Sequence, residues 1–98
     1  MRTSIKTLEK LCDWINEATG SPMTPYTQDE SGKLRANIGN FHLSHAYGGV
    51  SVHRMHNAGG GVTTPIVYGH VSKRECFEAL CGFMAGIEFA QQQSEAAK

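Results

Sequence analysis

Two histidines, His42 and His53, are the residues whose type and placement come nearest to a reactive site. Both fall on the polar side of alternating segments, so a hairpin between those segments would bring the two imidazoles close together. Paired imidazoles bind transition metals or exchange protons. A metal site needs three or four ligands, and the sequence contains no Cys-x-x-Cys or His-Glu-x-x-His spacing. We therefore expect a solvated polar face without a metal or cofactor, and we keep a histidine-based metal site as a third hypothesis.

Nucleophilic catalysis has little support in this sequence. The three cysteines, Cys12, Cys76 and Cys81, all fall within helical patterns, where we expect them to act as small buried hydrophobes. Cys76 is the least secure of them because it follows Lys73 and Arg74 in the first turn of a predicted helix. The acidic residues form no pair with a defined separation. We predict that the protein is not an enzyme.

Two features resemble anion sites. The glycines at 59–61 follow a predicted strand but lead into another strand, whereas a phosphate cradle needs a helix N-terminus beside the glycines. A flexible hairpin loop is therefore expected there. His70, Lys73 and Arg74 lie near the start of the second predicted helix, where backbone N–H groups attract anions. An ordinary solvated helix start is the favoured interpretation.

Length and composition describe a single small domain. The chain has 98 residues, of which 40% are hydrophobic and 18% charged, and nine basic residues balance nine acidic ones. A dedicated nucleic-acid binder usually carries a basic excess, which is missing here. The first residues start an amphipathic pattern instead of a signal peptide, so we expect a cytoplasmic protein.

Helical periodicity appears at both ends of the chain. Apolar residues recur at spacings of three and four over 4–19 and again over 72–91. Ser72 and Glu75 have the spacing of a capping box. Gly82 and Gly86, four residues apart, predict a close approach of another backbone to the second helix. We expect one domain over 1–91 and a frayed tail over 92–98.

Strand periodicity occupies the middle of the chain. Four segments starting at 34, 41, 50 and 62 alternate between apolar and polar residues, separated by turn signals at 39–40, 47–49 and 57–61. Pro65 lacks an N–H donor, so the last strand should be an edge or be broken there. The sequence thus predicts an α+β fold of order α-β-β-β-β-α, an antiparallel meander with both helices on its apolar face. His45 falls on that face and is expected to be a satisfied core residue.

The opposite sheet face is free of helices in this prediction and is the expected surface for a partner. Its candidate partner-binding residues are Arg35, Asn37, His42, Ser51, His53 and Arg54.

The amino-acid sequence resembles those of small uncharacterised proteins encoded by phages and prophages. The stretches that carry this resemblance are KTLE (6–9), TGSPMTPY (19–26), KLRANIGN (33–40), AYGGV (46–50) and GHVSKRE (69–75). The resemblance covers most of the chain and brings no catalytic residues with it. It implies a non-enzymatic accessory protein that docks on a host or defence protein complex and interferes with it, in the cytoplasm of the host cell.

The predicted topology is similar to that of the double-stranded RNA-binding domain, with a helix, an antiparallel sheet and a last helix opening on Ser-Lys-Arg. In that family, basic residues at the start of the last helix reach phosphates, which implies this role for Lys73 and Arg74. Four predicted strands instead of three, the lack of dense lysines and the acidic Glu75 depart from the family pattern. The alternative function is therefore a nucleic-acid-binding module that uses His70, Lys73 and Arg74. The sequence leaves open whether the chain is a monomer or a homodimer.

Overall fold

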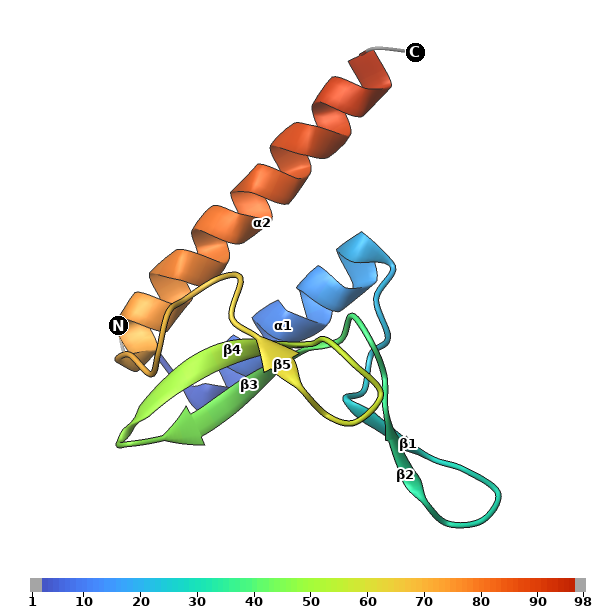
Figure 1. Ribbon diagram of the computed structural model, residues 1–98. Helices are drawn as coiled ribbons and strands as arrows, with labels where there is room; N and C mark the ends of the chain where they lie inside the picture. Colours follow the sequence, from blue (N-terminus) through green and yellow to red (C-terminus); the bar gives the residue numbers. More distant parts are fainter. Residues whose placement is uncertain (1–2, 97–98) are drawn as a thin grey trace.

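The computed structural model describes residues 3–96 and confirms the α+β class (Figure 1). The elements in chain order are α1 (Ile5–Thr19), β1 (Tyr26–Gln28), β2 (Leu34–Ala36), β3 (Phe41–Ala46), β4 (Gly49–Met55), β5 (Val62–Thr63) and α2 (Lys73–Ala96). Both helices contact each other, and they meet the β3–β4 hairpin in one shared core. The buried members of that core are Leu8, Cys12, Ile15, Phe41, Val50, Val52, Cys76 and Leu80.

α1 has a well-defined start and end. The Ser4 hydroxyl accepts the Thr7 N–H at 3.2 Å, which satisfies one of the free donors of the first turn. Gly20 ends the helix in the left-handed conformation (φ 69°) that glycine adopts without strain. The apolar stripe predicted from the spacing is buried at Leu8 and Ile15.

The larger sheet has the order β3–β4–β5 and is antiparallel. β3 and β4 are joined by a two-residue turn, Tyr47–Gly48, in which both residues have positive φ (54° and 72°). This confirms the reversal predicted at 47–49. Val50 also forms an isolated antiparallel bridge with Val71, so the chain just before α2 lies beside β4.

The prediction of one four-stranded meander is wrong. β2 pairs with β1 instead of β3, and these two strands form a separate two-stranded sheet. The predicted turn at 39–40 is not a hairpin, because the Gly39 N–H and the Asn40 carbonyl both bond to Met55. β2 meets β1 instead through a tight turn, in which Asp29 Oδ1 accepts the backbone N–H groups of Ser31 and Lys33 at 3.0 Å.

The last predicted strand is shorter than its alternation suggested. β5 ends at Thr63, two residues before Pro65, which confirms the expected break at the proline. Ile66 then packs against the core, whereas Tyr68 is 95% exposed.

α2 continues to Ala96, past the boundary predicted at 91, because its final residues contain no helix breaker. Ala97 and Lys98, the end of the predicted tail, lie outside the described residues. The C-terminal part of α2 extends beyond the rest of the molecule (Figure 1). Gly82 and Gly86 lie on the exposed side of α2, and a Cβ added at either would meet no atom within 4 Å, so the close approach predicted there is wrong. Neither described helix combines the length and apolarity needed to cross a membrane.

Candidate binding surface

Three histidines line up across the sheet face that points away from the helices. His42 in β3 is the register partner of His53 in β4, and their ring centroids are 5.8 Å apart. His70 lies next to Val71, which is bridged to β4, and its ring centroid is 6.0 Å from that of His53. Three adjacent backbone segments thus each contribute one imidazole to a single row.

Polar neighbours fix the two ends of this row. Asn40 Oδ1 lies 3.1 Å from Nδ1 of His42, and Ser44 Oγ lies 3.3 Å from Nε2 of His70. Ser51, beside the row on β4, is fully buried, and its hydroxyl has no hydrogen-bond partner within residues 3–96.

The imidazoles of His42 and His53 have lowered pKa values. Burial is the main cause for both, because it disfavours the charged ring. The charge of the next histidine adds to it: His53 lowers the pKa of His42, and His70 lowers that of His53. Near neutral pH this part of the surface therefore presents neutral rings that donate and accept hydrogen bonds.

Tyr47 extends the row at its outer end. Its ring centroid is 5.7 Å from that of His70, while its side chain is 97% exposed. Its left-handed backbone conformation (φ 54°) costs a residue other than glycine about 1–2 kcal/mol. In the sequence, Tyr47 is recognisable only as part of the turn signal at 47–49. A large aromatic in a position that favours Gly or Asn was the signal that it carries more than the turn. We call His42, His53, His70 and Tyr47 the histidine face.

The structure places three predicted partner-binding residues away from this face. Arg35 lies in the separate β1–β2 sheet and pairs with Asp29 at 3.3 Å. The Asn37 amide follows that sheet and donates to the Thr24 carbonyl at 3.0 Å. Arg54 lies on the helix side of β4, with its guanidinium 5.5 Å from the centre of the Phe41 ring. His42, His53 and the buried Ser51 are the three that share the outer face.

The residues of the predicted nucleic-acid site do not converge. His70 contacts Ser44 on the outer face. Lys73 lines a hollow near the β3–β4 turn, whereas Arg74 pairs with Glu78 along the exposed side of α2 at 3.4 Å. The start of α2 therefore presents these three side chains to different surroundings.

Two further expectations change. His45 lies on the helix side of β3, as its alternation predicted, but it is exposed instead of buried in the core. Cys81 is also exposed, whereas Cys12 and Cys76 are buried as expected.

Burial raises the pKa of the Cys76 thiol. Burial also raises the pKa of the Cys12 thiol to about 12, and the nearby Cys76, Asp13 and Glu9 add to this shift. Within the described chain, no group of three His, Cys, Asp or Glu side chains is arranged to hold a metal ion.

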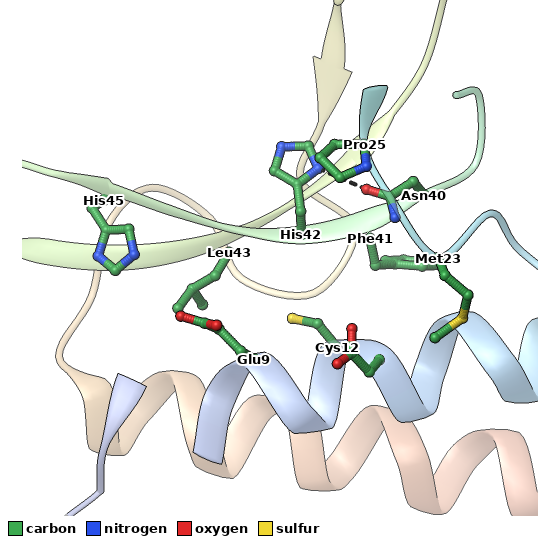
Figure 2. Close-up of a pocket in the computed structure, with 10 residues that line it drawn as sticks. Glu9, Cys12, Met23, Pro25, Asn40, Phe41, His42, Leu43 and His45 are labelled. Atoms are coloured by element: carbon green, nitrogen blue, oxygen red, sulfur yellow. Dashed lines mark hydrogen bonds between the residues drawn. The ribbon is translucent and has the colours of Figure 1, made fainter. Parts of the chain in front are cut away.

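A hollow of about 240 Å³, open to solvent, lies between α1 and β3 (Figure 2). Its floor is formed by α1, and Met23 and Pro25 close one end. The residues that line it are Glu9, Cys12, Asp13, Met23, Pro25, Asn40, Phe41, His42, Leu43 and His45.

No protein-family model, curated protein or solved structure matches this chain. The resemblances to phage-encoded proteins and to the double-stranded RNA-binding domain thus stay predictions.

Proposed function

We propose that this protein is a non-enzymatic binding domain that docks on another protein through the histidine face. The observation that carries the proposal is Tyr47, which is held 97% exposed in a left-handed conformation at the end of a row of three imidazoles. Strained backbone persists where the surrounding structure enforces it, and it is concentrated at functional positions. Replacing Tyr47 by glycine would remove this strain, so folding alone gives no reason for a tyrosine there.

The chemistry of the face suits a protein partner. Tyrosine offers a large rigid contact area with a polar end and is enriched among the residues that dominate binding energy at interfaces. His42 and His53 stay neutral near pH 7, so a partner can cover them without burying charge. Tyr68, two residues before His70, offers a second exposed aromatic ring in the same segment.

Two of the three thiols support the proposal that the protein is not an enzyme, whereas Cys81 is exposed. Cys12 and Cys76 are buried and have raised pKa values, so both are protonated and out of reach at neutral pH. From the resemblance to phage-encoded proteins alone, we further propose that the partner is a host or defence protein complex in the cytoplasm.

A pull-down from host lysate, with and without nuclease, tests the docking proposal. The informative variant is Tyr47→Gly, which removes the exposed ring while relieving the left-handed strain, so that a loss of binding cannot be attributed to unfolding. The matched control is Phe89→Ala, which removes an exposed aromatic from the distant part of α2. We expect Tyr47→Gly to retain roughly one tenth of the partner or less, and Phe89→Ala to retain all of it.

Two outcomes contradict the proposal. Equal capture by wild type and Tyr47→Gly would exclude the histidine face as the docking surface. Loss of the captured material on nuclease treatment, or a steep fall with salt, would favour the nucleic-acid alternative at His70, Lys73 and Arg74.

A further inference from the structure

One edge of β3 faces away from the sheet, since β3 stands at the end of the order β3–β4–β5. The Met55 N–H donates to the Asn40 carbonyl at 2.8 Å, which fixes the alternation along the strand. The even-numbered residues of β3 bond to β4, whereas Leu43 and His45 direct their N–H and C=O groups outward. Among the described residues, no other strand pairs with this edge.

At Phe41, the backbone groups on this edge are already hydrogen-bonded by a side chain of α1. The side-chain amide of Asn16 donates to the Phe41 carbonyl at 2.9 Å and accepts the Phe41 N–H at 2.7 Å. These are the two hydrogen bonds that a neighbouring strand would make. The edge is thus closed at Phe41 and open at the next two outward positions, Leu43 and His45.

The open part lacks the usual protection of an edge strand. Proteins block such edges with Lys, Pro, a bulge or a covering element, because an unprotected edge pairs with other chains. Residues 43–46 are Leu-Ser-His-Ala, which include no Lys or Pro, and they pair with β4 in unbroken register. Residues 43–46 can therefore pair with an added strand.

The hollow between α1 and β3 runs along this open edge, and its floor is acidic (Figure 2). Glu9 and Asp13, both exposed, lie one helical turn apart on α1 and line the hollow with Leu43 and His45. The four-residue step from Glu9 to Asp13 rises by about 6 Å along the helix, close to the roughly 6.8 Å between alternate residues of a strand. Alternate side chains of an added strand would therefore meet the two carboxylates in turn.

We infer that the β3 edge binds an extended basic peptide, which adds as a strand at Leu43 and His45 and places Lys or Arg side chains over Glu9 and Asp13. The backbone groups of β3 provide the hydrogen bonds of such a pairing. The carboxylates select the charge of the peptide, and the two-residue period of a strand sets the spacing of its basic residues. The residues that this pairing uses, Leu43, His45, Glu9 and Asp13, are not part of the histidine face, although His42 of that face also lines the hollow.

Charge also argues against a second copy of this chain as the occupant. Pairing of two β3 edges would bring Glu9 and Asp13 of both copies together at the interface, where their negative charges would repel. A basic peptide neutralises the same carboxylates.

Three synthetic peptides of ten residues test the inference: an alternating Lys-Val peptide, an alternating Glu-Val peptide, and the Lys-Val peptide with every backbone amide N-methylated. We expect the first alone to bind in a fluorescence titration. Amide hydrogen exchange gives the direct readout, because strand addition should slow exchange at Leu43 and His45 by about tenfold or more. Binding of the methylated peptide would show that charge alone is recognised, and it would overturn the strand-addition model.

Variants of the edge locate the binding. His45→Pro removes an outward N–H and leaves the bonds to β4 in place, so it should weaken Lys-Val binding roughly two- to tenfold. Glu9→Gln combined with Asp13→Asn should weaken it by a similar factor without touching the strand. Glu88→Gln, an exposed carboxylate on α2, serves as the matched control and should change nothing. Failure of the Lys-Val peptide to bind, or its displacement by self-association of the protein in sedimentation measurements, overturns the inference.

Discussion

Asn16 of α1 acts as a surrogate strand for Phe41 of β3, with hydrogen bonds to both its carbonyl and its N–H. The amide is almost fully buried, at 1% exposure, and joins a helix to a strand 25 residues further along the chain. Asn16→Ala would leave two buried backbone groups unpaired, so we expect a loss of about 2–4 kcal/mol in the free energy of unfolding. Urea denaturation measures this loss.

Asn16→Asp distinguishes the pairing from simple packing. The carboxylate still accepts the Phe41 N–H but cannot donate to the Phe41 carbonyl, and it introduces a buried charge. Its destabilisation should equal or exceed that of Asn16→Ala. The exposed neighbour Glu17→Ala should stay within about 0.5 kcal/mol of wild type. A similarly small effect of both Asn16 variants would show that the pairing contributes nothing to stability.

Two glycines should respond in opposite directions to alanine. A Cβ at Gly49 would lie 2.8 Å from the Val71 carbonyl oxygen, so Gly49→Ala must push the chain before α2 away from β4. A Cβ at Gly82 meets nothing within 4 Å, and alanine there should stabilise the helix by about 0.5–1 kcal/mol. Thermal unfolding of the two variants checks both signs. A stabilising Gly49→Ala would contradict the close approach between Gly49 and Val71.

The three thiols should separate cleanly in a native labelling experiment. Cys81 is exposed on α2, whereas Cys12 and Cys76 are buried with raised pKa values. We therefore expect a thiol-specific reagent near pH 8 to modify one cysteine rapidly and the other two only after unfolding. Cys81→Ser should abolish the rapid phase. Rapid labelling of Cys76 in that variant would revive the possibility of a reactive thiol.

The sequence predicted the elements whose signals are local. The apolar stripe of α1, the Tyr47–Gly48 turn and the break at Pro65 all follow from short-range rules that the structure confirms. The Ser72–Glu75 cap is present in part: the Ser72 hydroxyl accepts the Glu75 N–H, but the Glu75 carboxylate bonds to that hydroxyl instead of the Ser72 backbone.

The pairing of strands was not predictable in the same way. The apolar alternation of β2 is compatible with pairing to β3 as well as to β1. β1 has only three residues, which are too few to show a strand pattern in the sequence. That error put Arg35 and Asn37 on the histidine face, whereas they belong to another sheet. The close approach of His42 and His53 was predicted, because it depends on a hairpin with a recognisable turn. His70 joins them only through the Val50–Val71 bridge, which no pattern in the sequence indicates.

The histidine face should make the stability of the protein depend on pH. The pKa values of His42 and His53 are lowered in the folded protein relative to the ordinary value of 6.5, mainly by burial. Below that value the unfolded chain binds more protons than the folded one, so the free energy of unfolding rises with pH there. This contribution is complete above about pH 6.5 and is lost as the pH falls through the lowered pKa values.

Urea denaturation at pH 5, 6 and 7 measures this slope. Replacing both residues, His42→Gln with His53→Gln, removes the two titrating rings while keeping polar side chains of similar size, so the variant should lose less stability than wild type between pH 7 and pH 5. Each single variant should remove part of the pH dependence of the free energy of unfolding. If the two rings, 5.8 Å apart, repel each other when charged, each single variant should remove more than half of the effect of the double variant. Equal slopes in wild type and the double variant would mean that these two imidazoles do not set the pH dependence.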